Sequence, residues 1–172
     1  MSDSNKVADL KEKLKQALNS TFKVISDDFK LNDKFEKTKN SKKLDHFELG
    51  NLNSKNDFIK ARAESDSSAL KRKFSDDDIF KKNLPSNSSC KSLYTIAEKI
   101  RYESLGSKML KGIEKNFKDN YNQMIGSKRK DQLKTKEDVS VAEAFELYML
   151  KNFHNLEPVS YTHLTLPTIL LV

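Results

Sequence analysis

Residues 110–124, LKGIEKNFKDNYNQM, carry the clearest helical pattern in the chain. Apolar residues recur there every three or four positions, and most lysines fall between them. Each residue of an α-helix is rotated by about 100° from the one before, so the two sets lie on opposite sides of one helix. The pattern predicts an amphipathic helix whose inner face comprises Leu110, Ile113, Phe117, Tyr121 and Met124. Its opposite, basic face comprises Lys108, Lys111, Lys115 and Lys118.

The same spacing on either side of this stretch predicts further helices over 5–25, over 57–74, around 79–80 and from 91 to Gly106, where a glycine favours a helix end. A basic loop is expected at 127–130. The last helix should begin at Ser140, which forms a capping box with Glu143. Its expected inner face comprises Val141, Ala144, Phe145, Tyr148 and Met149. We therefore predict a mostly α fold of five or six amphipathic helices in one domain, with a long polar connection near 26–56.

The composition excludes several classes of protein. The chain has 172 residues, a net charge of +7 and one cysteine, which rules out a disulfide framework and a cysteine-based zinc site. Its four scattered glycines do not form a phosphate-binding loop. The sequence contains no stretch that predicts a membrane-spanning helix, and its N-terminus lacks the apolar segment of a signal peptide. We expect a helical protein of the cytoplasm.

Individual side chains that could support chemistry all have a simpler structural interpretation. His46, His154 and His163 lack a second ligand at metal-binding spacing, and Cys90 lacks a nearby histidine. Asp76–Asp78 suit a helix N-terminus better than a Mg²⁺ site. Asp66-Ser67-Ser68 begins a metal-adhesion motif of the form DxSxS, but position 70 is Leu. We therefore expect no catalytic, cofactor-binding or metal-binding residue in this chain.

The basic face of 108–118 is the one candidate for partner binding. Lys108, Lys111, Lys115 and Lys118 could contact an acidic partner, although a solvated helix face explains them as well. A positive protein can also bind nucleic acid. However, only four of the 32 basic residues are Arg, the residue that favours base readout and bidentate phosphate contacts. Nucleic acid is therefore the less favoured partner.

The C-terminal residues 159–172, VSYTHLTLPTILLV, contain no Lys, Arg, Asp or Glu and differ sharply from the sequence before them. Residues 159–168 resemble the translation of a transposase sequencing adapter. We expect 159–172 to be a non-native read-through tail and 1–158 to be a truncated part of a longer protein.

Three segments resemble, in order and spacing, the N-terminal region of the CobT family. They are 62–70 (RAESDSSAL), 98–116 (EKIRYESLGSKMLKGIEKN) and 138–158. The central one matches a family pattern close to EQaRvEAlGsrxMkGVaxNL. Ser75 and Phe80 stand where the family often has His, so no role for those histidines is carried over. Within the central segment, Glu98 and Arg101 share a helix face and are interpreted as a structural pair.

The resemblance implies a function that the residues alone do not give. CobT is a subunit of cobaltochelatase, which inserts Co²⁺ into hydrogenobyrinic acid a,c-diamide in cobalamin biosynthesis. The family complex uses ATP, Mg²⁺ and Co²⁺, and its other subunits are the AAA+ ATPase CobS and the large subunit CobN. The resemblance implies a non-catalytic, partner-binding helical region. Two alternatives remain open: a basic helical module that binds nucleic acid or another polyanion, and a purely structural helical scaffold.

Overall fold

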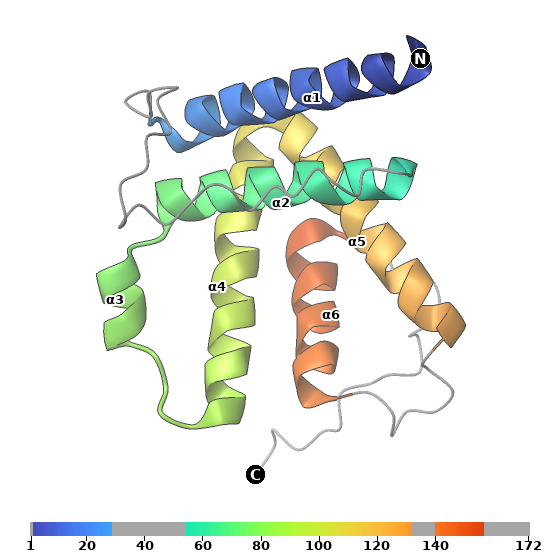
Figure 1. Cartoon of the computed structure of the whole chain (residues 1–172). Helices are drawn as coiled ribbons and strands as arrows, with labels where there is room; N and C mark the ends of the chain where they lie inside the picture. The colour runs from blue at the N-terminus through green and yellow to red at the C-terminus, as the bar shows by residue number, and fades with distance from the viewer. Residues whose placement is uncertain (1, 29–53, 132–139, 157–172) are drawn as a thin grey trace. The chain divides into compact units, whose positions relative to one another are not determined.

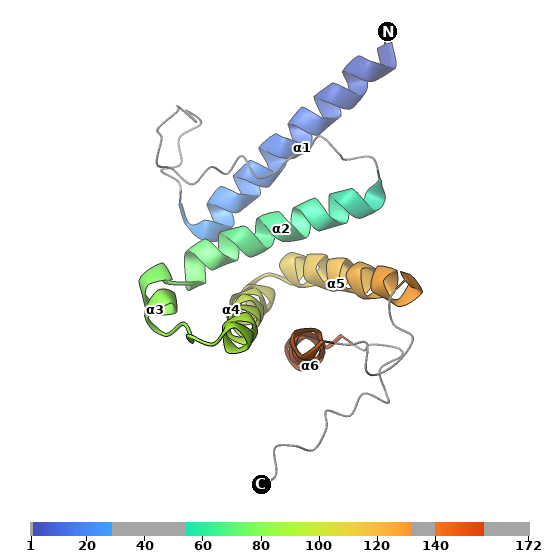
Figure 2. The same cartoon turned by 60° about the horizontal axis from the view of Figure 1, so that its bottom comes forward.

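The computed structural model describes the backbone of residues 2–28, 54–131 and 140–156. Within these ranges the chain forms helices and no strand, which confirms the predicted mostly α fold (Figures 1 and 2). The helices are α1 (Ser2–Ser26), α2 (Lys55–Phe74), α3 (Asp77–Lys82), α4 (Ser88–Met109), α5 (Lys111–Asp131) and α6 (Val141–His154). Most of the predicted polar connection, 29–53, and the tail 159–172 lie outside the described residues.

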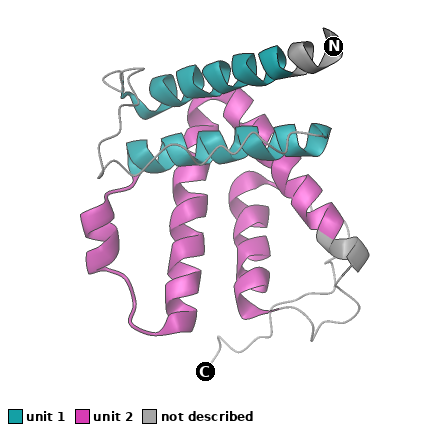
Figure 3. Ribbon diagram, in the orientation of Figure 1, with its two compact units in different colours: residues 1–74 teal, residues 75–172 magenta. Residues whose placement is uncertain are grey.

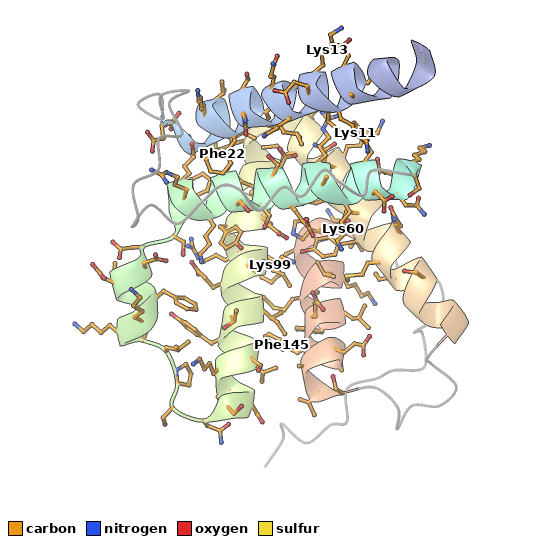
Figure 4. The ribbon with its side chains drawn as sticks, in the orientation of Figure 1. Lys11, Lys13, Phe22, Lys60, Lys99 and Phe145 are labelled. Carbon is orange, nitrogen blue, oxygen red and sulfur yellow. The ribbon has the colours of Figure 1, made fainter. Side chains whose placement is uncertain are left out.

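The chain divides into two compact units, residues 1–74 and 75–172 (Figure 3). In the first unit α1 packs against α2. The buried side of α1 comprises Leu18, Phe22 and Ile25, at the spacing that the sequence predicts, and Phe22 lies between the two helices in Figure 4. Leu10, earlier in α1, is exposed. Among the described side chains of α1, the buried ones therefore lie in its second half, and they pack with Ala63, Ala69 and Leu70 buried in α2.

Local capping explains where the helices of the first unit begin and end. The Ser54 hydroxyl accepts a hydrogen bond from the Asp57 amide at 3.2 Å, and the Asp57 carboxylate accepts one from the Ser54 amide at 2.9 Å. This reciprocal capping box starts α2 two residues before the predicted position. Asp27, with φ of 56°, ends α1 in the left-handed region. Asp27 and Asp28 then form ion pairs with Lys73 and Arg72, respectively, which join the C-terminal ends of α1 and α2.

In the second unit α4 packs against both α5 and α6. The predicted core residues Ile113, Phe117 and Tyr121 are buried, together with Ile100 of α4 and Leu150 of α6. The short helix α3 is capped by Asp76, whose carboxylate accepts hydrogen bonds from the amides of residues 78 and 79. The Phe80 and Tyr94 rings, tilted by 31° with their centroids 5.2 Å apart, connect α3 to α4.

The break between α4 and α5 differs from the prediction. Gly106 does not end a helix, because α4 continues past it, and Gly106 is buried. No glycine of the described residues has the positive φ that is typical of a glycine at a helix end. The helix instead ends at Leu110, whose backbone is extended with φ of −136° and ψ of 113°. Leu110 is therefore exposed rather than part of the inner face, and Lys108 belongs to α4 rather than to α5. The prediction of a basic loop at 127–130 was also wrong, because α5 continues to Asp131.

The inner face of α6 was predicted only in part: Ala144, Phe145 and Met149 are half-buried. The helix begins as expected, because Ser140 accepts a hydrogen bond from the Glu143 amide at 3.2 Å. However, Val141 and Tyr148 are exposed, whereas Leu150 and His154 are buried. Apolar residues occur on both sides of α6, so periodicity alone could not determine which side packs against α4.

Within the described ranges, no helix is long and apolar enough to cross a lipid bilayer.

Candidate functional site

A buried polar cluster lies where residues of α4, α5 and α6 meet. Glu103, Tyr121 and His154 are each no more than 2% exposed, and Lys99, labelled in Figure 4, lies beside them. Polar side chains are rarely buried this completely without a specific structural or functional reason. This cluster is therefore a candidate for a functional site among the described residues.

Glu103 and Tyr121 form the polar centre of the cluster. The Tyr121 hydroxyl donates a short hydrogen bond to Oε2 of Glu103. The Lys99 ammonium lies 4.0 Å from Oε1 of the same carboxylate and 5.4 Å from the centroid of the Tyr121 ring. Burial, and then the neighbouring Glu103 carboxylate, raise the pKa of Tyr121 far above its ordinary value. Tyr121 therefore remains a hydrogen-bond donor and cannot act as a base near neutral pH.

His154 sits against the aromatic side of the cluster. Its ring meets the Phe117 ring edge to face at a centroid distance of 5.9 Å and lies 5.8 Å from the Tyr121 ring. Within the described part of the chain, neither ring nitrogen has a hydrogen-bond partner. Burial, assisted by the nearby positive charge of Lys118, lowers the pKa of His154 to about 4. His154 is therefore a neutral core side chain near pH 7.

Removing the Tyr121 hydroxyl tests whether this cluster stabilises the fold. We expect Tyr121→Phe to lower the free energy of unfolding by roughly 2 kcal/mol, because a buried carboxylate oxygen loses its donor. Tyr148→Phe is the matched control, since Tyr148 is exposed and should change stability by less than about 0.5 kcal/mol. Urea titrations followed by circular dichroism measure both. Equal stability of the two variants would contradict a stabilising hydrogen bond.

The other sequence-derived candidates are not brought together. Asp76 caps α3, Cys90 is exposed in the first turn of α4, and Asp66 is buried in α2 of the first unit. His46 and His163 lie outside the described residues. In the ranges that the structure describes, no three His, Cys, Asp or Glu side chains are grouped so that they could hold a metal ion.

The predicted Glu98–Arg101 pair is present. The Arg101 guanidinium donates two hydrogen bonds to the Glu98 carboxylate, at 2.7 and 2.8 Å, which raises the pKa of Arg101. Oε1 of Glu98 also accepts a hydrogen bond from the Ser75 hydroxyl at 2.6 Å. The pair thus attaches the start of the second unit to α4. This arrangement agrees with the structural interpretation of the pair.

The four candidate lysines do not form one continuous basic face. Lys108, in α4, is exposed, as are Lys111 and Lys115 in α5. Lys118 is only partly exposed and donates a hydrogen bond to Glu114 at 2.7 Å, which lowers the pKa of Glu114. The bend at Leu110 separates Lys108 from the others. Three exposed lysines near this bend therefore remain as candidate contacts.

Charge reversal checks the placement of these lysines. We expect the double variant Lys111→Glu, Lys115→Glu to keep the helical circular dichroism of the wild-type chain, because both side chains are exposed. Its free energy of unfolding should differ from the wild-type value by about 1 kcal/mol or less. A variant that loses its helical signal would show that these side chains contribute to the core.

The cluster of Glu103, Tyr121 and His154 was not anticipated from the sequence. Tyr121 was placed in the core, but nothing in the sequence paired it with Glu103, 18 residues earlier. One signal was available for His154: it follows Leu150 by four residues and Leu147 by seven, which places all three on one side of α6.

The described residues thus form a helical protein with one buried polar cluster, formed by Glu103, Tyr121 and His154. Residues 8–157 match the family model described as Cobalamin biosynthesis protein CobT. The chain belongs to the CobT family and is thus a protein of cobalamin biosynthesis. No curated protein and no solved structure matches the chain.

Proposed function

We propose that this chain is a non-catalytic part of the CobT-like subunit of a cobaltochelatase and acts in the cytoplasm. It works with the AAA+ ATPase subunit CobS and the large subunit CobN. The whole complex inserts Co²⁺ into hydrogenobyrinic acid a,c-diamide and couples this insertion to ATP hydrolysis. The observation that carries the proposal is the family match, which extends over residues 8–157.

The side-chain environments are compatible with this role. Metal insertion requires groups that can accept the pyrrole protons, positioned in a cleft that holds the tetrapyrrole. Of the titratable groups in the buried cluster, Tyr121 stays protonated near neutral pH and His154 is enclosed by aromatic rings. The contacts of these two side chains join α4, α5 and α6. In the proposed complex, the reactive groups belong to other subunits.

Direct capture tests the proposed role. The full chain is immobilised and exposed to the purified ATPase subunit of a cobaltochelatase, with an unrelated AAA+ ATPase as control. We expect the immobilised chain to retain the cobaltochelatase ATPase and not the unrelated ATPase. Failure to retain it, combined with binding to duplex DNA that weakens steeply with salt, would favour the nucleic-acid alternative instead.

A second assay separates docking from chemistry. The chain alone is incubated with Co²⁺, ATP and the tetrapyrrole, and metal insertion is followed by visible absorption. We expect an unchanged spectrum. Time-dependent insertion by the chain alone would overturn the non-catalytic assignment.

A further inference from the structure

Three large apolar side chains are exposed near the junction of α4 and α5. Leu105 is 36% exposed, Met109 50% and Leu110 45%. Leu105 and Met109 lie one turn apart on one side of α4. Leu110 is the next residue, and its extended backbone caps the helix. Single exposed apolar residues are common, but a group of them often marks an interaction site. We name Leu105, Lys108–Gly112 and Lys115 the corner surface.

The exposed charges of the corner surface are positive. Lys108, Lys111 and Lys115 are all exposed. The one acidic residue between Leu105 and Lys118 is Glu114, and it is hydrogen-bonded to Lys118. Apolar side chains bordered by lysines complement a partner that is both apolar and acidic.

Gly112 adds a backbone feature to the same surface. It lies in the first turn of α5, is exposed, and a Cβ atom built on it would meet nothing within 4 Å. The fold therefore has no steric need for glycine there, and its negative φ does not require glycine either. Glycine lowers helix stability relative to alanine, but it allows another backbone to approach closely.

We propose that the corner surface binds an acidic amphipathic helix of the ATPase subunit. This inference rests on the proposed function. The apolar side of the partner helix covers Met109 and Leu110, its carboxylates contact the three lysines, and its backbone passes close to Gly112. An amphipathic helix fits because a short apolar patch with charged borders matches a helix that has one apolar stripe.

Surface variants of the full chain test the inference by titration against the purified ATPase subunit. We expect Met109→Asp to weaken binding about tenfold or more, because it places a carboxylate in the centre of the apolar contact. Lys108→Glu with Lys111→Glu should weaken binding as well, and this loss should shrink at high salt. Tyr148→Asp is the matched control: Tyr148 is also exposed, but it lies on α6, outside the corner surface.

The glycine variant excludes unfolding as an explanation. Gly112→Ala should raise the unfolding midpoint and nevertheless weaken binding, because the added methyl group obstructs the partner backbone. Gly126→Ala is its control, since Gly126 is also exposed in α5 with open space around it. It should raise the midpoint without any effect on binding.

The outcomes separate this inference from the proposed function. If the wild-type chain does not bind the ATPase subunit, the proposed function fails and the inference fails with it. If the wild-type chain binds, and Met109→Asp and Gly112→Ala bind equally well, only the corner surface is overturned. If both variants weaken binding while Tyr148→Asp and Gly126→Ala do not, the corner surface is the docking site.

Discussion

Phe117→Asp is expected to unfold the unit that contains α4, α5 and α6. Phe117 is 1% exposed, and its ring packs against that of His154. The substitution removes an aromatic ring from the core, which typically costs about 3–5 kcal/mol, and it also buries a carboxylate. An unpaired buried charge costs several kcal/mol more. Because whole domains are stable by only about 5–15 kcal/mol, the unit should lose its helical circular dichroism.

Phe153→Asp provides the matched control for this prediction. Phe153 is 50% exposed near the C-terminal end of α6, so the same change of side chain should alter the stability by about 1 kcal/mol or less. Thermal melts of both variants, followed at 222 nm, distinguish core from surface. A soluble and fully helical Phe117→Asp variant would show that Phe117 is not a core residue.

Acid should destabilise the fold through His154. Burial lowers the pKa of His154 from 6.5 to about 4, so the folded state favours the neutral ring. The contribution of this residue to stability is complete above pH 6.5 and is lost as the pH falls from 6.5 towards 4. At pH 4.5 the expected loss is about 2 to 3 kcal/mol, since each unit of pKa shift corresponds to about 1.36 kcal/mol. The charged groups that act on this ring are Lys118 and Glu114 on α5 and Lys99 on α4.

Comparison with His154→Phe isolates this effect from the other groups that titrate. Urea titrations at pH 7.5 and pH 4.5 give the loss of stability for each protein. Carboxylates and the other histidines contribute to both, so the difference between the two losses reports on His154. We expect the wild-type chain to lose about 2 to 3 kcal/mol more than the variant. Equal losses would mean that folding does not lower the pKa of His154.

The helices could be predicted from the sequence because their signals are local. The spacing of Ile113, Phe117 and Tyr121 identified the buried side of α5, and Ser140 with Glu143 identified the start of α6. The Asp76 cap was also anticipated, because an acidic residue before a helix satisfies free backbone amides. Each of these features depends only on residues within one or two turns of each other.

Features that depend on packing between helices could not be predicted in this way. The exposed Val141 and the buried His154 lie on different sides of a helix that has apolar residues on both. Its orientation is determined by contacts with α4. The end of α4 at Leu110 rather than at Gly106 has a similar origin: Gly106 is buried in the unit, and its carbonyl accepts a hydrogen bond from the Leu110 amide at 3.0 Å.

The corner surface could be predicted only in part from the sequence. The lysines were identified as surface residues, and Lys111 and Lys115 are exposed as predicted. Their relation to Met109 and Leu110 was missed, since these residues were treated as parts of one continuous helix. The bend at Leu110 changes which side chains are neighbours, and a one-dimensional pattern does not contain that bend.

Sedimentation velocity of the full chain mixed with the cobaltochelatase ATPase subunit tests the central claim most directly, because it detects a complex in solution without immobilisation. If the chain acts by docking to that subunit, the two proteins should sediment together as a faster boundary whose amount saturates as the chain is added. Two boundaries that keep the sedimentation coefficients of the separate proteins, at concentrations up to tens of micromolar, would contradict the account.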